Sequence, residues 1–77
     1  MVYERIVKAL ADQFEIDPVK ITRDTDVMND LGADSLDLVE LIMTLEDEYG
    51  ISVTDESIYE RKTVGEIADY IESIIDQ

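Results

Sequence analysis

Residues 31–50 read LGADSLDLVELIMTLEDEYG and carry the signals that begin and end a helix. Asp34 or Ser35 can serve as the N-cap, and Asp37 follows three residues after Asp34, as in a capping box with Asp in place of Glu. Gly50 is suited to the left-handed conformation that often terminates a helix. We therefore predict a helix that starts at Ser35 and stops before Gly50.

The apolar residues of this helix, predicted over residues 35–49, fall on two separate faces. At about 100° per residue, five of them cluster on one side and are predicted to face the core: Leu38, Leu41, Ile42, Leu45 and Tyr49. A second stripe lies roughly opposite and mixes apolar with acidic side chains: Leu36, Val39, Glu40, Met43, Glu46 and Asp47. Exposed apolar residues are common and often carry no meaning. Here three share one stripe that begins beside Ser35, which favours a docking surface for several partners.

The N-terminal segment also has the periodicity of an amphipathic helix. Apolar residues recur at helical spacing from Tyr3 to Phe14. Asp17-Pro18 is expected to end this helix, because proline cannot continue the hydrogen-bond ladder. Residues 15–34 then form a long loop, which in a compact domain is usually packed or functional, and its apolar anchors are Ile16, Ile21, Val27 and Leu31.

The C-terminal part is predicted to contain one short and one longer helix. Residues 54–60 are expected to form the short helix, capped by Thr54 or Asp55 with Ile58 pointing inward. The sequence Thr63-Val64-Gly65-Glu66 matches a capping box for a helix over residues 64–75, whose apolar face holds Val64, Ile67, Ala68, Ile71 and Ile75. The expected fold is all-α: a small four-helix bundle of three longer helices and one short helix, with a long first loop.

The composition indicates a single domain, residues 1–77, stabilised by packing alone. A chain of 77 residues buries one small core and offers no deep cleft. The chain has no Cys and no His, which excludes disulfides and the Ser-His and Cys-His pairs that activate nucleophiles. No apolar run approaches the ~20 residues of a membrane-spanning helix, and residues 1–8 lack a signal-peptide pattern. We expect a cytoplasmic monomer that does not insert into membranes.

The formal net charge of −14 indicates partners with basic surfaces. Such a surface repels nucleic-acid phosphates and anionic lipids, and attracts basic proteins at rates that fall as salt rises. Twelve acidic residues and no Lys or Arg lie between Asp24 and Glu60. Loops that start at Asp24 or Asp30 lack the ligands and glycine of an EF-hand, so no specific metal site is predicted. The acidic run 46–48 is read as a solvated face rather than as an acid–base pair.

Three roles are open to Ser35. As a catalytic nucleophile it lacks both a base and a Gly-x-Ser-x-Gly context. As a helix cap it would be ordinary, since serine is common at helix starts. As a modified residue it lies in a favourable place, because the free N–H groups and the dipole of a helix N-terminus favour an attached phosphate. The residues alone leave the cap and the modification as alternatives.

Residues 31–37, together with VEL at 39–41 and LEDEYGI at 45–51, resemble acyl carrier proteins of the type II fatty acid synthase. The resemblance covers essentially the whole chain in length, helix order and acidity. It implies that Ser35 receives 4′-phosphopantetheine from coenzyme A through a holo-synthase, which is a phosphopantetheinyl transferase. It also implies that the arm's terminal thiol carries acyl groups as thioesters, so the protein would be a carrier and not an enzyme.

The resemblance further implies roles for the neighbours of Ser35. Asp34 matches the acid that assists attachment of the arm. The stripe residues match the helix that partner enzymes recognise, namely fatty acid synthase enzymes with basic docking patches: Leu36, Val39, Glu40, Met43, Glu46 and Asp47. This agrees with the face found on the helical wheel.

Two alternatives to fatty acid biosynthesis remain open. Within the carrier class, the protein would serve a polyketide, lipoteichoic or other specialised pathway. In a different class, it would be an acidic regulatory protein that binds divalent ions or a basic partner, with Ser35 only a cap. Loading by a phosphopantetheinyl transferase separates the two classes.

Overall fold

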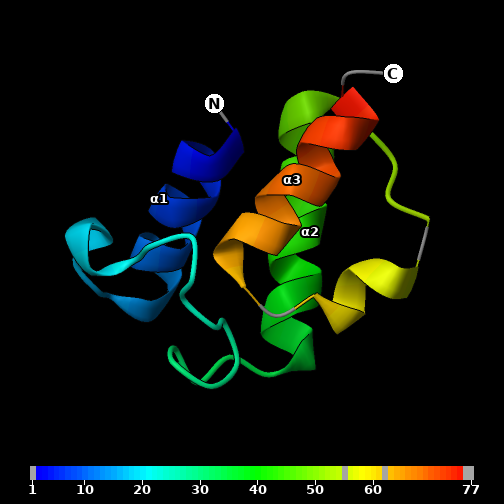
Figure 1. The fold of residues 1–77 in the computed structure, drawn as a ribbon. Helices are drawn as coiled ribbons and strands as arrows, with labels where there is room; N and C mark the ends of the chain where they lie inside the picture. Colours follow the sequence, from blue (N-terminus) through cyan, green and yellow to red (C-terminus); the bar gives the residue numbers. More distant parts are fainter. Residues whose placement is uncertain (1, 55, 62, 76–77) are drawn as a thin grey trace.

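The computed structural model describes residues 2–54, 56–61 and 63–75. Their regular elements, in chain order, are α1 (Val2–Phe14), the 3₁₀ segment η1 (Pro18–Lys20), α2 (Ser35–Tyr49), the 3₁₀ segment η2 (Glu56–Glu60) and α3 (Val64–Ile75) (Figure 1). In this part of the chain the only β pairing is an isolated bridge between Asp26 and Thr63. The prediction of a helical fold is therefore confirmed.

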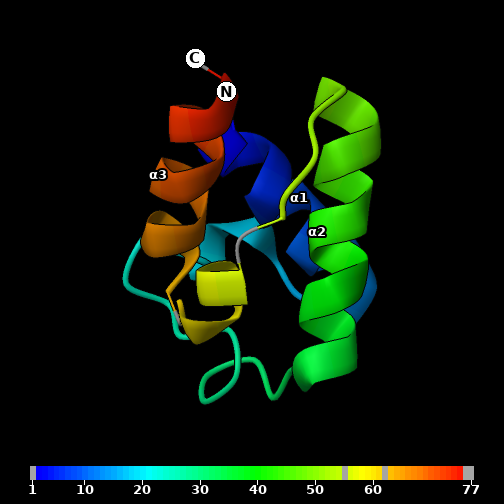
Figure 2. The same cartoon turned by 90° about the vertical axis from the view of Figure 1, so that its right-hand side faces the viewer.

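The α1 helix packs against both α2 and α3 and runs antiparallel to α2 (Figure 1). Figures 1 and 2 both show η2 beside the first half of α2 and the start of α3. The side chains between the helices form one apolar core, and its largest fully buried members are Ile6, Leu10, Leu38, Leu41, Ile42, Leu45, Ile58, Val64, Ile67 and Ile71. None of the described helices is long and apolar enough to span a membrane.

The bounds predicted for α2 and α3 are confirmed, because both helices carry their signals locally. Asp34 is the N-cap of α2 and forms a capping box with Asp37. Gly50 has a φ of 63° and donates its N–H to the carbonyl of Glu46, which ends the helix. The predicted core face of α2 is buried, with Tyr49 packed partly against it. In α3 only Ile75, in the last turn, departs from the predicted face and is exposed.

The end of α1 lies where the loop was predicted to begin, but its stop signal differs from the prediction. The helix stops at Phe14, because Glu15 adopts the left-handed conformation with a φ of 56°. The N–H of Ile16 then bonds to the carbonyl of Ala11 at 3.1 Å, as in a Schellman motif. Asp17-Pro18 does not end α1 and instead begins η1, where the side chain of Asp17 accepts a hydrogen bond from the N–H of Val19 at 3.0 Å.

The long loop is held by buried anchors and by backbone bonds to α3. Ile21 and Val27 are buried as predicted, whereas Ile16 and Leu31 are half-buried. The carbonyls of Arg23 and Thr25 accept the N–H groups of Gly65 at 2.9 Å and Val64 at 3.0 Å, respectively. These donors belong to the first turn of α3 and have no partner within the helix. The loop therefore caps α3 through its backbone.

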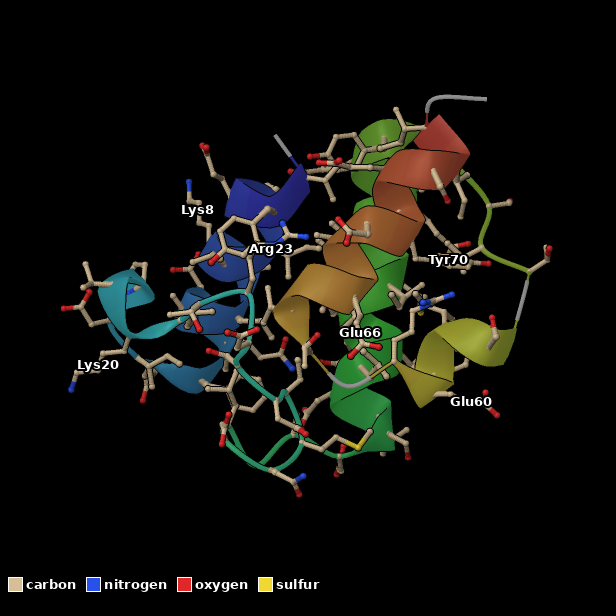
Figure 3. The ribbon with its side chains drawn as sticks, viewed as in Figure 1. Lys8, Lys20, Arg23, Glu60, Glu66 and Tyr70 are labelled. Atoms are coloured by element: carbon tan, nitrogen blue, oxygen red, sulfur yellow. The ribbon has the colours of Figure 1, made fainter. Side chains whose placement is uncertain are left out.

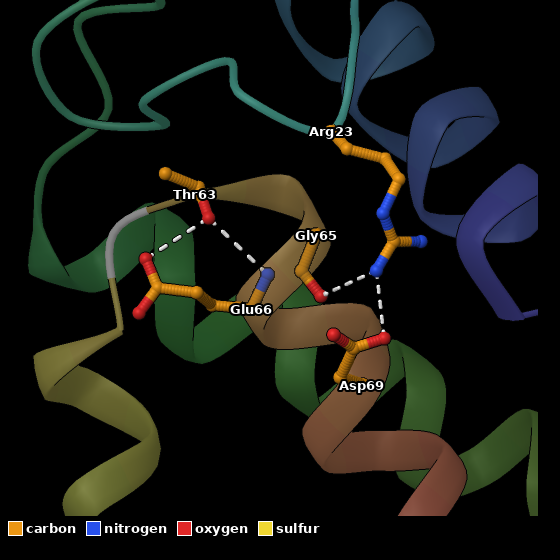
Figure 4. Close-up of polar contacts among 5 residues, drawn as sticks. All are labelled: Arg23, Thr63, Gly65, Glu66 and Asp69. Atoms are coloured by element: carbon orange, nitrogen blue, oxygen red, sulfur yellow. Dashed lines mark hydrogen bonds and ion pairs between the residues drawn. The ribbon is translucent and has the colours of Figure 1, made fainter.

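Gly65 permits this close approach of the loop to α3. A Cβ at this position would lie 3.0 Å from the carbonyl oxygen of Arg23. The guanidinium of Arg23 reaches the Gly65 carbonyl at 3.4 Å and the Asp69 carboxylate at 2.7 Å (Figure 4). The hydroxyl of Thr63 accepts the N–H of Glu66 and donates to the Glu66 carboxylate. Only half of the capping box predicted for α3 is present: Thr63 caps the N–H of Glu66, but the Glu66 carboxylate accepts the Thr63 hydroxyl rather than the backbone N–H of Thr63.

The short helix predicted over residues 54–60 is shorter and of a different type. The 3₁₀ segment η2 begins at Glu56, and the proposed cap at Asp55 lies outside the described residues. Ile58 points inward as predicted and is fully buried. The segment before η2 is tied to α2, because the carboxylate of Glu46 accepts the N–H of Val53 at 2.8 Å.

Candidate functional site

Ser35 is the first residue of α2 and its side chain is exposed. The capping box beside it is complete: the carboxylate of Asp34 accepts the N–H of Asp37 at 3.0 Å, and the carboxylate of Asp37 accepts the N–H of Asp34 at 3.1 Å. Asp34 therefore performs the capping. Ser35 is not the cap, and among the described residues its hydroxyl has no hydrogen-bond partner.

The backbone that leads to Ser35 is fixed by the loop. Gly32 has a φ of 74° and donates its N–H to the carbonyl of Met28 at 3.1 Å. Ala33 is buried and donates to the carbonyl of Val27 at 3.1 Å. With the loop holding one side and the capping box the other, an exposed hydroxyl is presented on a short, well-anchored turn.

The start of α2 has the chemistry to accept a phosphate ester. The N–H groups of Ser35 and Leu36 have no partner among the described residues, and they lie at the positive end of the helix dipole. One oxygen of each capping carboxylate faces a backbone N–H rather than the hydroxyl. A phosphodiester on Ser35 would thus meet free donors next to carboxylates that are already hydrogen-bonded.

One contact at this site comes from α1 and was not predicted from the sequence. The side-chain amide of Gln13 donates to Asp37 at 3.1 Å, to the oxygen that the capping box does not use. Gln13 is 24 residues away in the chain, and no local pattern indicates the contact.

The outward stripe of α2 is only partly free. Leu36 is 72% exposed and Met43 is 57% exposed, whereas Val39 is half-buried. Glu40 and Asp47 are exposed, and no described residue donates a hydrogen bond to their carboxylates. Glu46 is half-buried and bonded to Val53. The structure therefore divides the six predicted partner-binding residues into four available side chains and two that also serve the fold.

Charge is distributed unevenly over the molecule. The last turn of α2 contains no basic residue and carries Glu46, Asp47 and Glu48. These negative charges interact unfavourably with the negative end of the helix dipole. Glu48 forms an ion pair with Arg5 of α1, and this hydrogen bond raises the pKa of Arg5. Figure 3 shows Lys8 and Lys20 extending from α1 and η1, on the opposite side from Glu60 of η2. Among the described residues, no three acidic side chains are grouped so that they could hold a metal ion.

The chain matches known carrier proteins. A family model described as "Phosphopantetheine attachment site" matches residues 4–71, which places the chain among the domains that bear this prosthetic group. It is 47% identical over 72 residues to the acyl carrier protein of Lactobacillus acidophilus, across 94% of this chain and 90% of that protein. It is 44% identical over 73 residues to the acyl carrier protein of Clostridium acetobutylicum, across 95% of both chains.

A solved structure of acyl carrier protein from Enterococcus faecalis matches with a TM-score of 0.80 and 32% identity, covering 95% of this chain and 92% of that one. The chain belongs to the acyl carrier protein family. Its cofactor is covalently attached 4′-phosphopantetheine, and it is a carrier rather than an enzyme.

Proposed function

We propose that Ser35 bears the 4′-phosphopantetheine and that the loaded protein carries acyl intermediates between the enzymes of fatty acid biosynthesis. The observation that supports this most strongly is the division between Asp34 and Ser35, since capping by Asp34 leaves an exposed hydroxyl without a structural duty. The pathway is supported by the resemblance of residues 31–51 to type II fatty acid synthase carriers and by relatives named acyl carrier protein.

The residues around Ser35 prepare it for attachment in three ways. The anchored turn holds its oxygen in the open, where a transferase can reach it. The free N–H groups of Ser35 and Leu36 favour the negative charge that attachment brings. Asp34 maintains the turn and has a second carboxylate oxygen with no described partner, which we propose assists the transferase. When bound, the group supplies a thiol that holds acyl chains as thioesters.

Partner enzymes would dock beside this arm on the outward stripe of α2. Leu36 and Met43 supply apolar contact, and Glu40 and Asp47 supply charge for Arg and Lys on the partner. Val39 and Glu46 are proposed to contribute from the edge of the surface while holding the fold. Residues 1–77 are proposed to act as one carrier domain, since the described buried residues form a single cluster.

Intact mass after incubation with coenzyme A and a phosphopantetheinyl transferase tests the attachment. We expect the wild-type chain to gain the mass of one phosphopantetheinyl group and Ser35→Ala to gain none. Ser52→Ala is the matched control, since Ser52 is also exposed but lies in the loop after α2, and it should load normally. No addition to wild type, or addition to Ser35→Ala, would contradict the proposal.

The pathway is tested by asking which loading enzyme accepts the holo protein. In a type II fatty acid synthase, the malonyl transferase should load a malonyl group onto the holo protein. The ketoacyl synthase should then elongate an acyl chain that is bound to it. If these enzymes reject it and an amino-acid-activating ligase loads it instead, the protein is a specialised carrier.

A further inference from the structure

The carboxylate of Asp37 connects α1 to the turn that presents Ser35. One of its oxygens accepts the backbone N–H of Asp34 at 3.1 Å, and the other accepts the side-chain amide of Gln13 at 3.1 Å. The backbone N–H of Asp37 returns to the carboxylate of Asp34 at 3.0 Å. Gln13, Asp37 and Asp34 therefore form a continuous chain of hydrogen bonds that ends at the residue before Ser35.

Among the described residues, this contact is one of two side-chain polar contacts that join α1 to α2. The other is the ion pair between Arg5 and Glu48, at the opposite end of the antiparallel pair. Glu48, the partner of Arg5, lies in the last turn of α2 and far from Ser35, whereas Gln13 contacts the first turn itself. Of these two contacts, the one from Gln13 therefore lies beside the turn that carries the hydroxyl.

The rotamer of Asp37 is the link through which Gln13 would act. Without Gln13, one oxygen of this half-buried carboxylate loses its donor, and the side chain can rotate away from the N–H of Asp34. The turn would then be held on one side only. The amide of Gln13 also stabilises the negative charge of the Asp37 carboxylate, which lies close to the proposed attachment point of the phosphate.

We infer that Gln13 is a positioning residue for attachment at Ser35, acting through Asp37 and the capping box. The inference rests on the proposed function of Ser35. Gln13 does not touch the reacting oxygen; it keeps the turn in the orientation that the transferase requires.

Loading kinetics of the apo protein with coenzyme A and a phosphopantetheinyl transferase test this role. We expect Gln13→Ala to lower kcat by about three- to tenfold, the range for losing one solvent-exposed hydrogen bond of ordinary net strength. KM should stay near the wild-type value, because the docking side chains of α2 are untouched. Ser73→Ala is the matched control: it removes one exposed hydrogen bond on α3 without changing charge, and it should load normally.

Gln13→Glu separates positioning from simple charge attraction. An added carboxylate should speed loading if it only attracts a basic transferase, but should slow it more than Gln13→Ala if it repels Asp37 and opens the capping box. Amide hydrogen exchange provides a second readout. Exchange at the N–H of Asp34 should accelerate in Gln13→Ala and stay unchanged in Arg5→Ala, which breaks the other contact between the helices.

The pair Gln13→Ala and Asp37→Ala completes the test. If Gln13 acts through Asp37, removing it in the Asp37→Ala background should slow loading no further. Normal kcat in Gln13→Ala, faster loading in Gln13→Glu, or an undiminished effect in the Asp37→Ala background would each overturn the inference. Failure of the proposed function gives a different result, because wild type would then gain no mass or Ser35→Ala would still gain it.

Discussion

Two adjacent residues at the start of α2 have different duties. The carboxylate of Asp34 caps the helix, and the hydroxyl of Ser35 is left exposed. The sequence alone allowed either residue to be the cap, because Ser and Asp are equally suited to that position. Only the observed bond from the N–H of Asp37 to Asp34 resolves the alternative, and it removes the main structural explanation for the serine.

The two left-handed residues that end helices allow a paired prediction. Glu15 ends α1 with a φ of 56°, a conformation that is unfavourable for a residue with a Cβ. Its negative charge also lies at the negative end of the helix dipole, which is unfavourable too. Glu15→Gly should therefore raise the free energy of unfolding by about 1 kcal/mol. Urea denaturation followed by circular dichroism provides the measurement.

Gly50→Ala is the mirror experiment. A Cβ at this position would meet no atom within 4 Å, so only the φ of 63° opposes it. The substitution should lower the free energy of unfolding by about 1 kcal/mol. If Glu15→Gly destabilises the protein while Gly50→Ala does not, this explanation of the helix ends is wrong.

At the scale of the element, α2 and α3 were predicted from the sequence at their observed bounds, because their caps and apolar faces are local. The predicted loop from residue 15 agrees with the end of α1, but Glu15 was missed as the stop signal because glutamate rarely adopts a left-handed φ. The capping of α3 by Arg23 and Thr25 was missed because it joins segments distant in sequence. In the candidate site, the outward stripe of α2 was predicted from helical periodicity. The hydrogen bond between Glu46 and Val53 was not predicted, because it depends on tertiary structure.

The apolar part of the stripe should affect transfer more than stability. Met43→Ala should change the free energy of unfolding by less than about 0.5 kcal/mol, since the side chain is exposed. Val39→Ala should cost about 1 kcal/mol because Val39 is half-buried. Both should slow acyl transfer by partner enzymes. Leu41→Ala, on the buried face of the same helix, should cost about 2–5 kcal/mol; similar losses at Met43 would place it in the core.

The acidic part of the stripe should govern association. Glu40→Lys and Asp47→Lys should slow loading by the transferase, most strongly at low salt, where the Debye length reaches about 30 Å. The rates of wild type and variants should converge as salt rises. Asp12→Lys makes the same charge change at an exposed position on α1, and an equal effect there would mean that total charge, not the stripe, controls docking.

At the scale of the whole molecule, repulsion between like charges destabilises the fold, and a small apolar core stabilises it. The chain has 20 acidic and 6 basic residues, and Arg5 and Arg23 are committed to ion pairs that join α1 to α2 and the loop to α3. Because both pairs are exposed, each contributes little to stability. The core and the backbone contacts between the loop and α3 therefore carry the fold.

Added salt should raise the melting temperature. Screening weakens repulsion among many carboxylates and weakens only two described ion pairs, so the balance favours the folded state. The melting temperature followed by circular dichroism should increase steadily with sodium chloride at fixed pH. A melting temperature that falls with salt would show that the ion pairs outweigh the repulsion.

Peptide mapping by mass spectrometry tests most directly whether the arm resides on Ser35. The chain has four serines, at positions 35, 52, 57 and 73, so intact mass alone does not locate the added group. After loading with coenzyme A and a phosphopantetheinyl transferase, fragmentation should place the phosphopantetheinyl mass on Ser35 and on no other serine. A modified peptide containing Ser52, Ser57 or Ser73, or a wild-type chain with no modified peptide, would contradict the account.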